Sequence, residues 1–289
     1  MVYYDMEIIH PFETNDLVRV GQLKDGGYVI NKRTFEYVDV IIGLGINADW
    51  SFEEGFVRRS TKEPEVYGYD FSVSADIFYK EYISRILYLF SVKFLLRLIR
   101  NPGKMAGLIR QNYLYAKLAR NTHLQFPKFF DGEKHKFFQL GISNEQKDHF
   151  IRFDEVIQNL RSKPAPYSIF LKIDIEFSEY RIMDDVFRYS DRICGMVIEF
   201  HELDVVWEQF SRIMQAAKQD FLVTHVHGNN YGDFIPGTQI PVALEVTFLN
   251  KNIIKENLQL SSLQYPLPGL DYPNDPSKAD LPLNFDTVR

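Results

Sequence analysis

The feature that most constrains the fold is a glycine-containing turn between a predicted buried strand and a predicted helix. β-Branched and apolar residues dominate residues 37–42, and this run stops at Gly43-Leu44-Gly45-Ile46-Asn47. A short apolar run bounded by glycine is typical of a buried strand. Ser51 can cap the helix that follows, which has two glutamates in its first turn. Residues 65–70 form a second strand-like run, so the order predicts a β-α-β unit.

The turn is suited to a bound nucleoside. Glycines let the backbone approach a ligand closely, and ligands of such sheets lie at the carboxyl ends of the parallel strands. Asp70 ends the second run, where an acidic side chain can accept hydrogen bonds from ribose hydroxyls. The dinucleotide fingerprint requires a third glycine, and Ala48 stands at that position, which disfavours a nicotinamide cofactor. An ordinary tight turn is the alternative.

Strand-like and helical runs alternate along the rest of the chain. Helices are predicted at 178–187 and 205–217, and further strands at 136–140, 168–173, 195–199, 221–226 and 242–248. The chain has 289 residues, of which 45% are hydrophobic, which is enough for one core of this size. We therefore expect a single α/β domain over residues 1–289, with a mostly parallel sheet covered by helices on both faces.

Two segments depart from this alternation. Residues 75–129 carry apolar residues at helical spacing and are predicted to form a helical insertion. Residues 264–289 include the proline-rich stretch and are predicted to form an extended tail, packed on the surface or around a partner. Arg85, Lys93 and Arg97 interrupt the longest apolar run, and these charges argue against a transmembrane helix.

Basic residues gather on the insertion. They suit contact with an anionic membrane or a phosphorylated substrate, while a solvated helix face or a contact within a homo-oligomer explains them equally well. The residues concerned are Lys93, Arg97, Arg100, Lys104, Arg110, Lys117 and Arg120.

Composition excludes some classes of partner. The net charge of −6 provides no global field that would gather nucleic acid, so we expect no nucleic-acid partner. The single cysteine, Cys194, cannot form an internal disulfide and is interpreted as a packing residue. The first residues lack the basic and apolar regions of a signal peptide, so a reducing cytoplasm is the expected compartment.

Carboxylates crowd the end of the predicted strand 168–173. Asp174 lies just past the apolar run, and Glu176 and Glu179 follow it. Such crowding indicates a metal, a bound cation or general-base chemistry, because like charges otherwise repel. For Glu179 we favour a structural role with Ser178 in capping the next helix. For Asp174 and Glu176 we favour a functional role.

Histidines follow the next two predicted strands. His201 is a candidate general base, since an imidazole can take a proton from a hydroxyl near neutral pH. His225 and His227 point to the same face of a strand and, with Asp174 and Glu176, are candidate ligands of a divalent metal. The metal is not favoured, because histidines that only form structural hydrogen bonds are common.

The segment before the first core strand has a strong local signal. Asp25-Gly26 is typical of a tight hairpin turn. We therefore interpret Asp25-Gly26-Gly27-Tyr28-Val29 as a polar, glycine-containing turn, with a β-hairpin as its simplest structure.

These residues together resemble the FkbM-like family of S-adenosylmethionine-dependent methyltransferases. The similarity runs in chain order over most of the chain outside the insertion, and its most specific element is Leu171-Lys172-Ile173-Asp174-Ile175-Glu176. Phe177 is a departure, because the family usually has glycine there; this side chain could narrow the pocket or alter the acceptor. The other matching segments are Asp25-Gly26-Gly27-Tyr28-Val29, Gly43-Leu44-Gly45-Ile46-Asn47, Tyr69-Asp70, Ile142-Ser143-Asn144, Glu199-Phe200-His201 and His227-Gly228-Asn229-Asn230.

The resemblance implies a Rossmann-like class I methyltransferase fold with a seven-stranded sheet and S-adenosylmethionine as the cofactor. It implies that the cofactor's amino-acid part lies along the turn, its ribose at Asp70 and its adenine near Ser143, with Tyr28 also in the binding site. It further implies methylation of hydroxyls on sugars or other secondary metabolites, often in surface-polysaccharide pathways. The turn residues concerned are Gly43, Gly45 and Asn47.

Our hypothesis from the sequence is therefore O-methyl transfer to a small, sugar-like hydroxyl. Asp174, Glu176 and His201 are expected to face the acceptor, with His201 as the base. A metal-assisted methyltransferase is one alternative. The other is a non-catalytic binding module whose basic insertion docks on a membrane or on a partner in polysaccharide biosynthesis.

Overall fold

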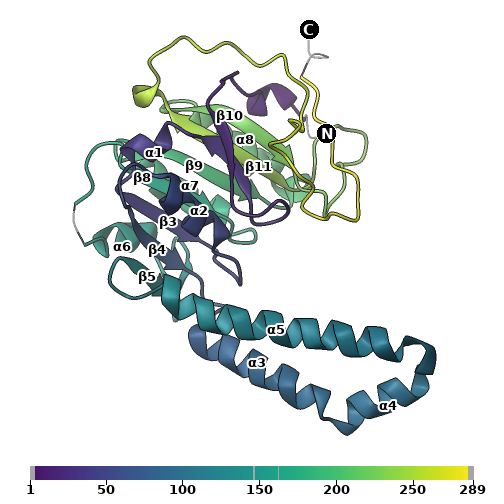
Figure 1. Cartoon of the computed structure of the whole chain (residues 1–289). Coiled ribbons are helices and arrows are strands. Elements are labelled where there is room, and N and C mark those ends of the chain that lie inside the picture. The colour runs from purple at the N-terminus through teal and green to yellow at the C-terminus, as the bar shows by residue number, and fades with distance from the viewer. Residues whose placement is uncertain (1–3, 146, 162, 286–289) are drawn as a thin grey trace.

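A seven-stranded sheet forms the centre of the molecule (Figure 1). The computed structural model describes residues 4–145, 147–161 and 163–285. The sheet has the order β10-β11-β9-β8-β3-β4-β5, and its neighbouring strands are parallel except at β11, which is antiparallel to both β9 and β10. This topology confirms the predicted Rossmann-like class I methyltransferase fold. The strands are β3 (Val40–Leu44), β4 (Glu65–Tyr69), β5 (His135–Phe138), β8 (Ile169–Ile173), β9 (Ile193–Phe200), β10 (Phe221–Gly228) and β11 (Leu244–Asn250).

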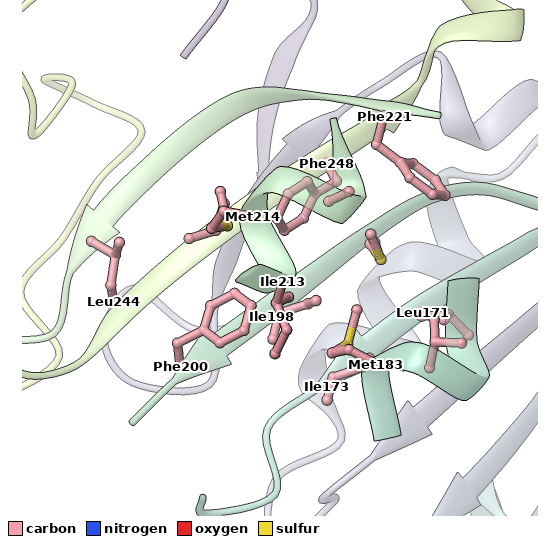
Figure 2. Close-up of a cluster of buried hydrophobic side chains, with 14 of the residues drawn as sticks. Leu171, Ile173, Met183, Ile198, Phe200, Ile213, Met214, Phe221, Leu244 and Phe248 are labelled. Carbon is pink, nitrogen blue, oxygen red and sulfur yellow. The ribbon is translucent and has the colours of Figure 1, made fainter. Parts of the chain in front are cut away.

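Helices cover both faces of the sheet, as the apolar strands require. Alternate residues of β3 show this: Ile42 belongs to one apolar cluster and its neighbour Ile41 to the other. The first cluster, part of which is drawn in Figure 2, packs the sheet against α6, α7 and α8. The second packs it against α1 and α2. These helices are α1 (Thr34–Tyr37), α2 (Ser51–Arg59), α6 (Phe153–Gln158), α7 (Glu179–Phe187) and α8 (Leu203–Ala217).

The first core strand lies further along the chain than predicted. Residues 34–37 are helical, and β3 begins at Val40 and continues through Gly43 to Leu44, where it still pairs with β4 and β8. Gly43 therefore lies within the strand and does not end it. A Cβ at this position would lie 2.5 Å from Oε1 of Glu53, so glycine is needed there for close packing of α2.

The start of α2 also differs from the prediction. Ser51 is the first helical residue and Trp50 is the cap position, with no capping hydrogen bond from its side chain. Instead, Oδ1 of Asp49 accepts a hydrogen bond from the backbone N–H of Ser51 at 2.9 Å. Asp49 thus takes the capping role that the sequence suggested for Ser51.

The predicted hairpin is present near the start of the described chain. Strands β1 (Leu17–Val20) and β2 (Tyr28–Asn31) are antiparallel, and Gly26 in the turn has a φ of +82°. Short elements complete the fold: the 3-10 helices η1 (Met6–Ile9) and η3 (Lys251–Ile253), and a parallel pair formed by β6 (Gly141–Ile142) and β7 (Phe150–Ile151).

The insertion is a helical hairpin that projects away from the sheet (Figure 1). It consists of α3 (Ala75–Leu89), α4 (Val92–Arg100), the 3-10 turn η2 (Pro102–Lys104) and α5 (Met105–Phe129). Its base is anchored by aromatic contacts, since the rings of Phe126 and Trp50 lie 5.5 Å apart. Among the residues that the structure describes, no helix combines the length and apolar character needed to cross a bilayer.

The C-terminal segment packs on the chain's own body. Tyr265 and Leu283 pair through two backbone hydrogen bonds, and both side chains are buried in the core with Phe285. A bridge between Gly228 and Leu281 attaches the segment to the edge strand β10. The described part of this segment combines extended stretches with turns and contributes side chains to the core, while residues 286–289 lie outside the described residues.

Candidate functional site

A cavity of about 270 Å³ lies at the carboxyl ends of β3, β4 and β8. Three predicted cofactor residues line it, namely Gly45, Asn47 and Asp70, and so do the predicted acceptor residues Asp174 and Glu176. The structure therefore brings these two groups, which lie far apart in the sequence, into one site. The remaining lining residues are Tyr69, Phe71, Ser72, Gly141, Ile142, Phe150, Ile175 and Ser178.

Gly45 makes the floor of this site possible. Its φ is +81°, and a Cβ at this position would lie only 1.6 Å from the carbonyl oxygen of Asp174. No other residue type fits without moving the backbone. Lys172 is buried below the turn and donates hydrogen bonds from Nζ to the carbonyl oxygen of Gly45 and, at 3.2 Å, to Oδ2 of Asp174. One ammonium group thus joins the turn after β3 to the carboxylate after β8.

Asp70 joins the two loops at the other side of the cavity. Its Oδ2 accepts a hydrogen bond from the backbone N–H of Asn47 at 2.7 Å. Its Oδ1 accepts from both the backbone N–H and the hydroxyl of Ser72, at 2.7 and 2.6 Å. A carboxylate has about four acceptor positions, so roughly one is left for a ligand hydroxyl. Asp70 therefore holds the turn in shape and retains some capacity to bind.

The other predicted cofactor residues do not line the cavity. Gly43 lies within β3, and the hydroxyl of Tyr28 donates to Asp174 at 3.1 Å and to Glu199 at 3.2 Å. Ser143 is buried, and its hydroxyl oxygen accepts from the N–H of Glu145 at 3.3 Å. A role of these three residues in cofactor binding stays a prediction.

The apolar wall of the cavity is the part that sequence reasoning missed. Phe71 and Phe150 contribute rings whose centroids lie 5.3 Å apart, and Ile142 and Ile175 add aliphatic surface. Phe71 directly follows Asp70 and Ile142 directly precedes Ser143, so both stand beside residues that had been singled out. In each of these two pairs, the polar residue had been chosen from the sequence as the binding residue, and its apolar neighbour had been passed over. Phe150 carries no comparable signal in the sequence.

Asp174 is charged at neutral pH. Burial would raise the pKa of its carboxyl, but the cations of Lys172 and His201 and the hydrogen bond from Tyr28 lower it below its usual value. The result is a carboxylate at the mouth of the cavity, beside the exposed side chain of Glu176.

His201 lies among carboxylates. Its Nδ1 is 3.1 Å from Oε1 of Glu179, and its Nε2 lies 3.7 Å from Glu176 and 3.9 Å from Asp174. Burial would lower the pKa of the imidazole, but Glu179 and its other acidic neighbours raise it to about 9. His201 is thus an imidazolium near neutral pH, and it must release its proton before it can act as the base that the sequence suggested.

Glu179 holds His201 in place. It is the first residue of α7 and is fully buried, and its Oε1 accepts a hydrogen bond from the backbone N–H of His201 at 2.9 Å. The sequence-based preference for a capping role overlooked this contact, which joins the start of α7 to the end of β9.

Glu199 lies behind His201. Its two oxygens accept hydrogen bonds from Asn229 at 2.5 Å and from Tyr28 at 3.2 Å. Burial, followed by the nearby carboxylates of Asp174 and Glu245, raises the pKa of this carboxyl well above its usual value. Of these two neighbouring carboxyls, Asp174 therefore gives up its proton more readily than Glu199 does.

Three side chains of the site could hold a divalent cation. Asp174, Glu176 and His201 each offer one ligand atom, and these atoms lie within 4.8 Å of one another. The set combines two carboxylates and one imidazole, which suits a borderline divalent ion. A cation at this position would have to displace the proton of His201.

His225 and His227 do not join that set, so the sequence-based metal group is wrong in its histidines. Nε2 of His225 lies 3.1 Å from Asp271, and His227 lies between Glu245 at 3.3 Å and Asp280 at 3.0 Å. Each histidine instead binds a carboxylate of the C-terminal segment, which covers this part of β10. That segment cannot be placed from the local pattern of β10.

No family model matches the chain, and no curated protein matches it. Among solved structures, similarity is found to the precorrin-6y C5,15-methyltransferase of Geobacter metallireducens (10% identity, TM-score 0.33, covering 76% of this chain and 85% of the other). The chain is also similar to an rRNA methylase of Streptococcus thermophilus (8% identity, TM-score 0.35, covering 76% of this chain and 90% of the other). A third similar structure is that of a Streptococcus mutans protein in complex with SAH (8% identity, TM-score 0.32, covering 76% of this chain and 93% of the other). These identities and TM-scores are too low to assign an activity.

Proposed function

We propose that the chain is an S-adenosylmethionine-dependent methyltransferase that acts on a hydroxyl of a small, sugar-like acceptor. The observation that carries the proposal is the cavity itself. It combines a glycine turn, a carboxylate at the end of β4, an apolar wall and a carboxylate at the end of β8. Such a combination of apolar surface and a few oriented polar groups is typical of a small-molecule site.

The parts of the cofactor match the parts of the cavity. The ribose would bind at the free acceptor position of Asp70, and the adenine would lie against Phe71, Ile142 and Phe150. The methionine part would follow the turn at Gly45 and Asn47. Its sulfonium would then point toward Asp174, and a carboxylate in a partly buried site attracts such a cation.

The chemistry requires one bond to break and one to form. The methyl carbon leaves sulfur and binds the acceptor oxygen, and the hydroxyl proton passes to the enzyme; most of the acceleration would come from holding the two reactants in line. His201 could accept the proton in the complex, because a sulfonium nearby disfavours its own charged form and brings its pKa down from about 9. Asp174 and Glu176 would hydrogen-bond the acceptor's hydroxyls, which supports a polyol.

The test is calorimetric titration with S-adenosylmethionine and its demethylated product, followed by turnover assays with sugar acceptors. Asp70→Asn should weaken cofactor binding about 10- to 100-fold, because it removes a charged acceptor. His201→Gln should lower turnover and leave cofactor affinity nearly unchanged. Asp191→Asn, which changes the same charge at an exposed residue of the body, should leave both quantities as they are.

Two outcomes would overturn the proposal in different ways. Absence of cofactor binding would favour a non-catalytic binding module. Unchanged affinity in Asp70→Asn would remove this residue from the site.

A second candidate function is metal-assisted methyl transfer, which is favoured by the convergence of Asp174, Glu176 and His201. Activity assays with a chelator test it. Loss of activity with the chelator and recovery with magnesium or manganese would support this candidate.

A further inference from the structure

The helical hairpin has a charge that is opposite to that of the rest of the chain. Residues 82–130 contain nine basic residues and no Asp or Glu, although the whole chain has a net charge of −6. Only one of the nine, Arg85, forms an ion pair within the part of the chain that the structure describes. The nine are Arg85, Lys93, Arg97, Arg100, Lys104, Arg110, Lys117, Arg120 and Lys128.

Helix α4 at the free end of the hairpin has three distinct faces. Phe94 is buried, with its ring 5.2 Å from that of Tyr88, and marks the face that packs on the hairpin. A second face exposes aliphatic side chains at helical spacing, namely Val92, Leu95, Leu96 and Ile99. A third face is basic, because Lys93, Arg97 and Arg100 also recur at helical spacing.

The exposed apolar surface continues onto the ends of the neighbouring helices. Phe90 is 84% exposed and Leu87 is 63% exposed at the end of α3, and Met105 and Ile109 are exposed at the start of α5. The end of α3, helix α4 and the start of α5 lie at the end of the hairpin that is far from the sheet (Figure 1). Since α5 has 25 residues, this end is roughly 35 Å from the base of the helix.

We propose that the free end of the hairpin docks on the surface of an anionic lipid bilayer. The aliphatic face of α4 and the side chains of Leu87 and Phe90 would enter the boundary between headgroups and acyl chains. The basic face would lie at the level of the anionic headgroups. A helix with a basic face next to an apolar face is suited to this position in the interface, and no membrane-spanning helix is needed.

The charge distribution disfavours the other occupants. Two copies of the hairpin tip would bring their clusters of like charge together, which opposes association through this surface. Nucleic acid would pair with the basic residues but would leave the exposed Leu, Ile and Val side chains in water. A bilayer is the partner that satisfies both the charge and the apolar surface.

Docking would tether the cavity to the membrane through the hairpin. Helix α3 begins at Ala75, four residues after Phe71, which lines the cavity. The hairpin and the cavity are thus joined by a short segment. This inference does not depend on the proposed methyl transfer, because lipid binding can be measured without cofactor or acceptor.

The experiment is co-sedimentation of the full chain with vesicles of phosphatidylcholine alone or mixed with phosphatidylglycerol. We expect binding to the mixed vesicles, and weaker binding at high salt. The triple variant Lys93→Gln, Arg97→Gln, Arg100→Gln should weaken that binding on the order of 100-fold. Its matched control is Arg58→Gln, Lys62→Gln, Arg212→Gln, which removes three exposed charges from the body and should bind as the wild type does.

A second pair of variants tests the apolar face. Val92→Ser, Leu95→Ser, Ile99→Ser should reduce binding by about tenfold or more, because it removes the side chains that would leave water. Leu23→Ser, Val205→Ser, Leu260→Ser changes equally exposed aliphatic residues of the body and should have no effect.

Three outcomes would overturn the proposal. The first is absence of binding to the anionic vesicles. The second is unchanged binding in both tip variants. The third is that vesicle binding is absent and the tip variants instead abolish self-association or binding to an RNA oligonucleotide. Sedimentation velocity would detect the self-association, and a gel-shift assay would detect the RNA binding.

Discussion

Two consecutive residues after β8 have backbone angles that side chains rarely adopt. Glu176 has a φ of 50° and Phe177 a φ of 79°. For a bulky residue such an angle is an outlier, and it costs on the order of 1–3 kcal/mol. A glycine would adopt the φ of Phe177 without this strain. Phe177 does not line the cavity, and its ring instead packs 5.6 Å from that of Tyr180.

Replacement of Phe177 separates the backbone strain from the packing of its ring. Phe177→Gly and Phe177→Ala both lose the contact with Tyr180, but only glycine accepts the positive φ without strain. We expect the glycine variant to be more stable than the alanine variant by about 1 kcal/mol in urea denaturation. An alanine variant that is equally or more stable would show that this angle stores no strain.

At the scale of the element, the start of α2 shapes the turn that lines the cavity. Helix α2 lacks a side-chain cap at Trp50, and Asp49 provides the nearest oxygen for the first N–H groups. The carboxylate also lies at the positive end of the helix dipole. Helix α2 therefore stabilises the loop from Gly45 to Trp50 through Asp49, although Asp49 does not line the cavity that contains Asp70.

Alanine substitutions at the two candidate cap residues distinguish their roles. Asp49→Ala should reduce the free energy of unfolding by about 1 kcal/mol, because it removes a carboxylate acceptor at the helix start. Ser51→Ala should change it by much less, since the hydroxyl of Ser51 has no hydrogen-bond partner in the described structure. The comparison uses chemical denaturation of both variants. A larger loss in Ser51→Ala would restore the sequence-based assignment of the cap.

At the scale of the whole molecule, the C-terminal segment closes the edge of the sheet. It covers β10 and supplies Asp271 to His225 and Asp280 to His227, partners that lie 46 and 53 residues further along the chain. Burial would lower the pKa of His227, but Glu245 and Asp280 raise it to about 10. The charged histidine therefore stabilises the attachment of the segment at neutral pH.

The stability of the fold should depend on pH through His227. Its pKa is about 10 in the folded chain and about 6.5 when unfolded, so its contribution is complete below pH 6.5 and is lost as the pH rises through 10. In this interval it changes stability by about 1.4 kcal/mol per pH unit. We expect the difference in unfolding free energy between wild type and His227→Gln to shrink as the pH rises from 7 to 10. A difference that stays constant over this interval would contradict the assigned pKa.

The layered fold could be predicted because its signals are local. Short apolar runs and helical periodicity indicate the seven strands of the sheet and the helices α2, α7 and α8 regardless of what packs on them, but they did not indicate α1 or α6. The insertion at 75–129 is helical except at residues 90–91 and 101. The element limits were less predictable: residues 37–39 look strand-like, but Tyr37 ends α1 and the pairing of β3 extends to Leu44. The choice between helix end and strand depends on contacts with neighbouring strands.

The sequence by itself determined which side chains stand at the ends of the strands, because the positions of Gly45, Asp70, Asp174 and His201 follow from the order of the elements. Only the tertiary structure decided which of these side chains meet. Glu179 binds His201, and the carboxylates of the C-terminal segment bind the histidines of β10. The physical reason is that hydrogen bonds and ion pairs act over a few ångströms in space, while the partners are joined by tens of residues whose path only the packed core settles.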